Sequence, residues 1–97
     1  MLGEMMNTAQ AQTIAEILKA VAHPVRLQIL SVLGQNERCV SEIMNALDAA
    51  QSAISQQLSV MRTRGVLSCR RDANRVFYRV SHPGVMKLLA CMIQNPQ

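Results

Sequence analysis

Arginine residues gather in one part of the chain and form the strongest chemical signal in the sequence. Residues 62–97 hold seven basic residues against the single acidic residue Asp72, whereas residues 1–61 hold three basic residues against five acidic ones. Six of the seven lie between positions 62 and 79: Arg62, Arg64, Arg70, Arg71, Arg75 and Arg79. A basic block beside a neutral or acidic half is typical of a surface that binds phosphate groups. Charge alone leaves a solvated charged face open as the alternative.

Short polar side chains precede and overlap this block at helical spacing. One face of a helix over residues 51–64 carries Ser52, Ser55, Gln56, Ser59 and Arg62, with Gln51 at its edge. Ordinary solvated helices carry Glu/Lys pairs on such a face. Serine, glutamine and arginine instead let a helix approach phosphates and base edges closely, and glutamine suits a bidentate contact with adenine. We therefore expect these six residues to contact DNA.

The chain has three cysteines, which lie far apart at Cys39, Cys69 and Cys91. A sparse, odd set does not form a disulfide framework, which favours a reducing cytoplasmic location. Cys39 stands just before a predicted helix and beside Arg38, where the helix dipole and the positive charge favour a reactive thiol. It is therefore the candidate sensing thiol. Cys69 and Cys91 fall at apolar positions of their elements, and we interpret them as small hydrophobic residues.

Hydrophobic periodicity predicts five helices that would position these residues. The first starts at Thr13 and stops at His23-Pro24, because the residue before proline is pushed out of helical geometry. Residues 1–12 are polar and are expected to be partly frayed. Further helices are expected over Pro24 to about Gly34, Val40 to Leu47, Gln51 to Arg64, and from Pro83 to near Asn95-Pro96, with residues 35–38 as a polar loop.

After Gly65 the apolar period changes from 3.6 to 2, which predicts a β-hairpin with Asp72-Ala73-Asn74 at its turn. Arg70, Arg71 and Arg75 would then lie near the hairpin tip, where we expect them, together with Arg62, to bind the DNA backbone. The order α-α-α-α-β-β-α predicts a mostly α fold with one small hairpin, a single winged helix-turn-helix domain over residues 1–97. In that fold the helix from Gln51 enters the major groove of double-stranded DNA and the hairpin is the wing.

Composition bounds the other function classes. The chain has 97 residues, a formal net charge of +4, 49% hydrophobic residues and 2% aromatic residues. This length allows one small domain, and so few aromatics disfavour modules that stack unpaired bases. Its four glycines make no phosphate-cradling loop, and no triad of catalytic residues is apparent, so we expect no enzyme and no cofactor. No membrane-spanning segment and no signal peptide are expected either.

Several stretches of the sequence resemble the arsenic-repressor (ArsR) family of small dimeric repressors, and together they cover most of the chain. They are residues 19–30, 39–43, 51–58, 61–67 and 70–79, and the run Gln-Ser-Ala-Ile-Ser-Gln-Gln-Leu over 51–58 is very like the recognition helix of the family. The resemblance implies a homodimer built from the first and last helices. It also implies an inverted-repeat operator and a block of transcription.

The same resemblance implies release of DNA by a metal, a metalloid or a reactive sulfur species. Metalloid sensors of the family carry Cys-Val-Cys where this chain has Cys39-Val40-Ser41, so one thiolate of that site is missing. Zinc sensors use the last helix, but Gly84 and Asn95 stand where ligands are expected and only His82 fits. We therefore expect no metal site. A metalloid or oxidant inducer acting on Cys39, and a repressor with no thiol or metal switch, are both left open.

A winged helix used only for protein–protein docking is the rival interpretation. Such a docking face carries large apolar or aromatic anchors. The exposed face predicted for residues 51–64 carries serine, glutamine and arginine instead. This difference favours DNA over a protein partner.

Overall fold

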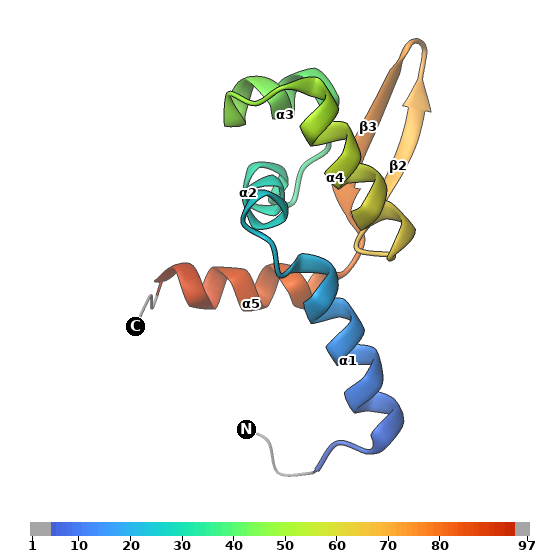
Figure 1. Ribbon diagram of the computed structural model, residues 1–97, viewed down its shortest axis with the longest axis vertical. Helices are drawn as coiled ribbons and strands as arrows, with labels where there is room; N and C mark the ends of the chain where they lie inside the picture. Colours follow the sequence, from blue (N-terminus) through green and yellow to red (C-terminus); the bar gives the residue numbers. More distant parts are fainter. Residues whose placement is uncertain (1–4, 95–97) are drawn as a thin grey trace.

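The computed structural model describes residues 5–94. Its elements follow one another in the order α1 (Thr8–Val21), α2 (Pro24–Leu33), β1 (Arg38–Cys39), α3 (Val40–Leu47), α4 (Gln51–Thr63), β2 (Leu67–Asp72), β3 (Arg75–Val80) and α5 (Pro83–Gln94). Figure 1 shows α2, α3 and α4 gathered beside a long β2–β3 hairpin, with α1 and α5 at the opposite end. This arrangement confirms the predicted winged helix-turn-helix. None of the helices described is long and apolar enough to cross a membrane.

The first helix begins earlier than the sequence pattern predicts. It starts at Thr8 rather than Thr13, because Asn7 and Gln10 form a reciprocal capping box. The Asn7 side chain accepts from the Gln10 backbone N–H at 2.8 Å, and the Gln10 side chain accepts from the Asn7 N–H at 3.0 Å. Residues 8–12 are thus helical, and the remainder of the segment expected to fray falls partly outside the described residues. Asn95 and Pro96, the expected end of the last helix, lie outside them too.

The helix-turn-helix is built around one apolar stripe on α4. Ile54, Leu58 and Met61 are each 0% exposed and pack with buried side chains of α2 and α3. The turn between α3 and α4 contains Asp48 at φ 50°, a left-handed conformation that aspartate tolerates better than most residues. Asp48 ends α3, and its N–H donates to the Met44 carbonyl.

The end of α4 leads directly into the wing. Gly65 adopts φ 81° and its N–H donates to the Arg62 carbonyl at 3.0 Å, while the Val66 N–H donates to the Met61 carbonyl at 3.0 Å. This pair of bonds is a Schellman motif, which requires a residue free to adopt positive φ. Val66 and Met61 are both buried, so the motif also fastens the base of the wing to the core.

Three antiparallel strands form the wing, in the order β1-β3-β2. The strand β1 was not predicted, because residues 35–38 were expected to be a loop. Two residues alone carry no period, and Arg38 and Cys39 become a strand by pairing with Tyr78 and Phe77 of β3. The β2–β3 hairpin itself confirms the predicted alternation and turn.

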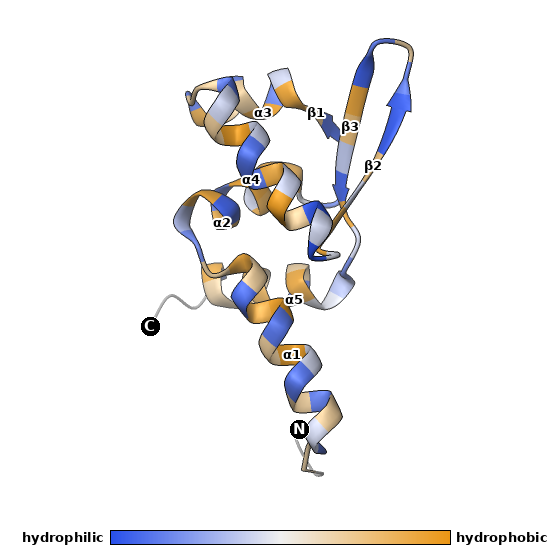
Figure 2. Ribbon diagram, turned by 45° about the vertical axis from the view of Figure 1, so that its right-hand side comes forward, coloured by the Kyte–Doolittle hydropathy of each residue, from blue (hydrophilic) through white to orange (hydrophobic). Residues whose placement is uncertain are grey.

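Most of α1 and α5 lies outside the core. The buried residues of α1 are Ala20 and Val21, and that of α5 is Val85. Figure 2 shows hydrophobic residues continuing along α1 where it extends away from the rest of the chain. The core is therefore centred on α2, α3, α4 and the base of the wing.

We expect Leu58→Ala to lower the free energy of unfolding by about 2–5 kcal/mol, because it removes buried methyl groups and leaves a cavity. Urea denaturation at one fixed protein concentration measures this effect. Ser59→Ala, at the adjacent exposed position, is the matched control and should change it by less than about 0.5 kcal/mol. A similar loss in both variants would contradict the assigned orientation of α4.

Candidate nucleic-acid interface

The face of α4 opposite its buried stripe carries the polar row. Gln51, Ser52, Gln56, Ser59 and Arg62 are exposed, and Ser55 is half-buried. Because Ile54, Leu58 and Met61 are fully buried, the helix has no freedom to rotate and present another face. The structure thus brings the six predicted residues onto one accessible surface.

A polar groove of about 370 Å³ separates the last turns of α4 from the wing. It is lined by Ser59 and Arg62 of α4, by Cys69, Arg70 and Arg71 of β2, and by Val76 and Tyr78 of β3. Nη1 of Arg62 lies 3.7 Å from Sγ of Cys69, so the guanidinium is held against the strand. Two predicted phosphate contacts, Arg62 and Arg71, therefore meet across this groove.

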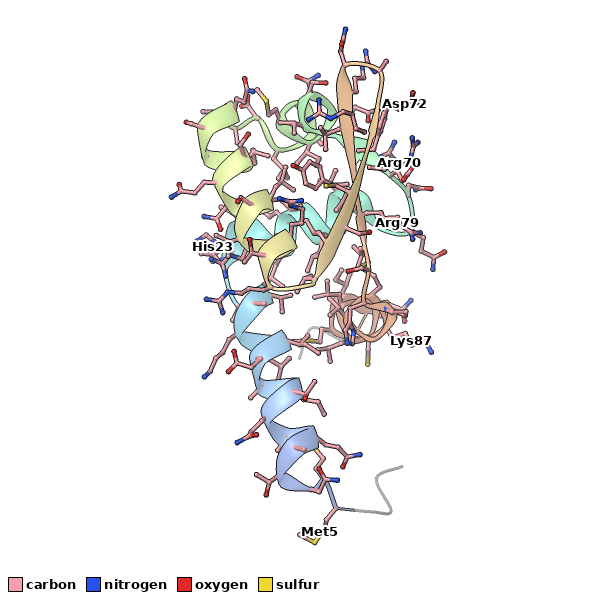
Figure 3. The ribbon with its side chains drawn as sticks, turned by 90° about the vertical axis from the view of Figure 1, so that its right-hand side faces the viewer. Met5, His23, Arg70, Asp72, Arg79 and Lys87 are labelled. Carbon is pink, nitrogen blue, oxygen red and sulfur yellow. The ribbon has the colours of Figure 1, made fainter. Side chains whose placement is uncertain are left out.

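Arg70 also borders this groove, but its side chain and that of Arg75 extend from the opposite face of the hairpin. Arg70 is paired with Phe77 across the strands and Arg75 with Asp72, whereas Arg71 is paired with Val76 on the groove face. Figure 3 shows Arg70, Asp72 and Arg79 directed away from α4. Arg75 is exposed at the tip, next to the turn.

Arg70 forms an ion pair within the protein, and its role as a DNA contact stays a prediction. Its guanidinium donates to both carboxylate oxygens of Glu37, with nitrogen–oxygen distances of 2.8–3.0 Å. The hydrogen bond from Arg70 lowers the pKa of the Glu37 carboxyl, and the hydrogen bond to Glu37 raises the pKa of Arg70. Sequence patterns did not identify Glu37, because it lies 33 residues from Arg70.

Arg26 is a second residue that sequence patterns did not single out. Its Nε donates to Oε1 of Gln57 at 2.8 Å, and its Nη1 donates to the Ala20 carbonyl at 3.4 Å. One half-buried side chain of α2 therefore joins the end of α1 to α4. This contact helps hold the recognition surface in a fixed relation to α1.

The predicted sensing thiol, Cys39, is buried. Its side chain is 4% exposed, and Sγ lies 3.2 Å from Oγ of Ser41. Its N–H donates to Glu42 at 2.9 Å, so a carboxylate stands beside the residue in addition to Arg38. Cys69 is half-buried, and Cys91, interpreted above as a small hydrophobic residue of the last helix, is exposed in the single chain. Cys39 as a sensing thiol stays a prediction.

The histidines occupy helix entrances. Nδ1 of His23 accepts from the Val25 N–H at 3.1 Å, which confirms that His23 is a turn residue before Pro24. His82 precedes α5, and its carbonyl accepts from the Val85 N–H at 3.1 Å. Across residues 5–94, no three His, Cys, Asp or Glu residues are grouped closely enough to hold a metal ion.

Comparison with known proteins identifies the family. A family model described as "Bacterial regulatory protein, arsR family" matches residues 23–68. The biofilm growth-associated repressor of Agrobacterium fabrum is 37% identical over 83 residues, which span 86% of this chain and 71% of that protein. The chain belongs to the arsR family of bacterial regulatory proteins. Members are transcriptional regulators, so the protein is a regulator rather than an enzyme.

Solved structures of proteins with similar sequences have the same fold. HlyU from Vibrio cholerae superimposes with a TM-score of 0.83 at 34% identity, covering 95% of this chain and 100% of that one. The homodimeric winged helix-turn-helix DNA-binding domain Mb0332 from Mycobacterium bovis gives a TM-score of 0.77 at 32% identity, covering 96% and 87%. Both likenesses cover nearly the whole described domain.

Glu42 should make folding stability depend on pH. The hydrogen bond from the Cys39 N–H is the largest cause that lowers its pKa from the ordinary value of 4.5, with smaller contributions from the Cys39 side chain, Arg38 and Arg75. The stabilisation is therefore present above pH 4.5 and is lost as the pH falls through the lowered pKa. Glu42→Gln retains an acceptor but no charge, so its thermal midpoint should lie below that of the wild type at pH 7 and approach it as the pH falls below the lowered pKa of Glu42. A difference that stays constant over this range would contradict the assignment.

Proposed function

We propose that this protein is a homodimeric repressor that binds an inverted-repeat operator in double-stranded DNA. The observation that carries this proposal is the outward polar row on α4, which lies next to an arginine-lined groove. A helix whose exposed side chains are serine and glutamine can approach base edges in the major groove without a steric or charge barrier. Repression is proposed by analogy with the biofilm growth-associated repressor, whereas HlyU of Vibrio cholerae is named a transcriptional activator.

The proposed interface contains two kinds of contact, one to bases and one to phosphates. Ser52, Ser55 and Gln56 stand near the start of α4 and read bases, with Gln51 and Ser59 at the edge of that face. Arg62, Arg71 and Arg75 bind phosphates, because they are exposed and no ion pair recorded for the described residues engages them. Base contacts set specificity, whereas phosphate contacts set register, affinity and salt dependence.

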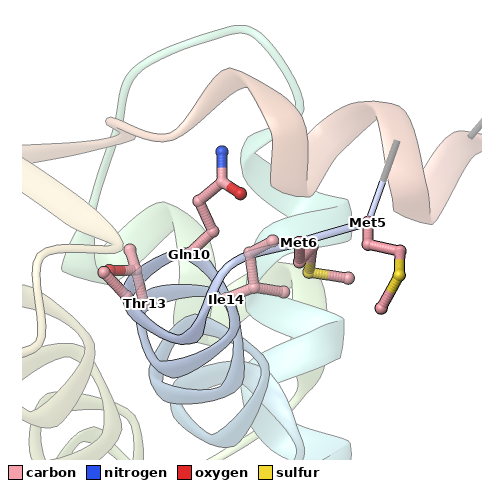
Figure 4. A pocket seen from close by; sticks show the side chains of 6 residues that line it. Met5, Met6, Gln10, Thr13 and Ile14 are labelled. Carbon is pink, nitrogen blue, oxygen red and sulfur yellow. The ribbon is translucent and has the colours of Figure 1, made fainter. Parts of the chain in front are cut away.

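Dimerisation is supported by the apolar surfaces of α1 and α5. Several large hydrophobic side chains on these helices are exposed: Ile14 by 42%, Leu18 by 44%, Leu88 by 44%, Met92 by 59% and Ile93 by 66%. An open apolar groove of about 500 Å³ lies between α2 and α5. A second open pocket of about 450 Å³, shown in Figure 4, lies at the start of α1 and is lined by Met5, Met6 and Ile14 together with the polar residues Gln10 and Thr13. Contiguous apolar surface of this kind marks a protein contact, and a second copy of the chain covers it in this proposal.

Selection of duplexes from a random library, followed by fluorescence anisotropy at several salt concentrations, tests the DNA interface. Gln56→Ala should change the preferred base at one or two positions per half-site, with about 1–3 kcal/mol of lost discrimination. Arg71→Ala should weaken binding to all duplexes alike and reduce the slope of log K against log [salt] by about 0.9 per protomer. Lys87→Ala, a change of charge on α5, is the matched control and should leave both quantities unchanged.

Uniform weakening by both variants would contradict the division into base readers and phosphate contacts. Absence of specific duplex binding by the wild-type protein would overturn the proposed function and favour a protein-docking role.

Parallel measurements on reduced, oxidised and As(III)-treated protein show whether a thiol-directed inducer releases the DNA. Loss of release in Cys39→Ser would identify Cys39 as the sensing thiol.

The dimer interface has its own test. Leu88→Glu places a charge on the exposed apolar face of α5 and should convert the dimer to a monomer in sedimentation velocity. Operator binding should weaken about tenfold or more, because two linked half-sites bind with a high effective concentration. Lys87→Glu introduces the same side chain at the adjacent exposed position, about 100° around α5, and should remain dimeric. A dimeric Leu88→Glu variant would place the interface elsewhere.

A further inference from the structure

The side chain of Arg70 links β2 with β3 and with the residue before β1. Arg70 extends from β2 across β3, where its guanidinium carbon lies 4.9 Å from the centroid of the Phe77 ring. It then reaches Glu37, the residue directly before β1, and forms a bidentate ion pair with it. We call Glu37, Arg70 and Phe77 the wing clamp. Bidentate arginine–carboxylate pairs fix relative orientation as well as adding energy.

The wing clamp connects β2 with the segment before β1, and these two strands are not neighbours in the sheet. The strand β1 has two residues and leads directly into α3, the first helix of the helix-turn-helix. The strand β2 is the edge strand on the other side of the sheet and carries Arg71. At the base of the wing, the Ser81 side chain donates to the Gly65 carbonyl at 2.9 Å. The wing clamp is a second attachment, farther along the hairpin toward its tip.

We propose that Arg70 is a positioning residue, which holds the wing at the angle where Arg71 and Arg75 meet the DNA backbone. The inference rests on the DNA-binding function proposed above. Arg70 and Arg71 are neighbours on β2, but they lie on opposite faces of the hairpin and therefore have different roles. The charge of Arg70 is balanced by Glu37, so it adds little to the counterion release that drives phosphate binding.

Glu37→Gln distinguishes this role from a direct phosphate contact, because the two roles predict effects of opposite sign. Removal of a negative charge beside DNA strengthens binding if Arg70 is thereby released to reach a phosphate. If Arg70 positions the wing, the same change loosens it and weakens binding. We expect operator affinity to fall about two- to fivefold, the range typical of an exposed ion pair. The salt slope should stay unchanged.

The matched control is Asp72→Asn. Asp72 is a second carboxylate near Arg70, but its oxygen lies 3.6 Å from Nη1 and it is exposed at the tip. Its loss removes the same charge without breaking the bidentate pair, so binding should stay equal or tighten slightly. Arg70→Gln removes the ion pair with Glu37 and should weaken binding. Arg70→Lys keeps the positive charge but lacks the planar guanidinium that forms the bidentate pair, so it should weaken binding as well. The double variant Glu37→Gln/Arg70→Gln should be no weaker than either single variant, because all three lack the same contact.

Hydrogen exchange of the β1 and β2 amides, measured without DNA, gives a second readout. Exchange should accelerate in Glu37→Gln and Arg70→Gln but not in Asp72→Asn. Tighter binding by Glu37→Gln, a smaller salt slope in Arg70→Gln, or unchanged exchange in both variants would each overturn the inference. If the wild-type protein binds no specific duplex, the proposed function fails, and the exchange data alone decide whether the wing clamp holds the wing.

Discussion

Burial of Ile54, Leu58 and Met61 on one side of α4 is the constraint on which the rest of the interface depends. Each is 0% exposed, and full burial of a side chain of this size contributes about 1.5–3 kcal/mol. Rotation of α4 about its axis would expose these residues and bury serine and glutamine, which is costly without new hydrogen bonds. The polar row faces outward because the apolar stripe must face inward. The Schellman motif after α4 then turns the chain, so that the wing starts beside the same helix.

A domain of this size can bury only a limited number of side chains, so parts of some helices stay exposed. The helices α2, α3 and α4 pack together around the core, whereas most of α1 and α5 is exposed to solvent. Small domains bury a smaller share of their surface than large ones, and association is one way to bury more. The fold thus presents the polar face of α4 from a closed core and leaves large apolar side chains of α1 and α5 exposed, the surface that the proposed dimer would cover.

Arginines of one sequence block have different roles because they stand on different faces. Arg62 and Arg71 line the groove between α4 and the wing, Arg70 lies across Phe77 to reach Glu37, and Arg75 stands exposed at the tip. Arg26, far from that block, contacts both Gln57 and the end of α1. Net charge therefore locates the arginine-rich half of the molecule, whereas the local contacts of each guanidinium differ within that half.

The sequence by itself determined the five helices, the hairpin and the polar face of α4, because these depend on local periodicity and on residues such as Pro24 and Gly65 that begin or end elements. It failed at the start of α1, where the Asn7–Gln10 capping box extends the helix, and at β1, which is too short to carry a period. The burial of Cys39 and the pairing of Arg70 with Glu37 were decided by tertiary structure alone. Partners 33 residues apart meet only when the sheet brings β2 beside β3 and β3 beside β1, and no local pattern encodes that meeting.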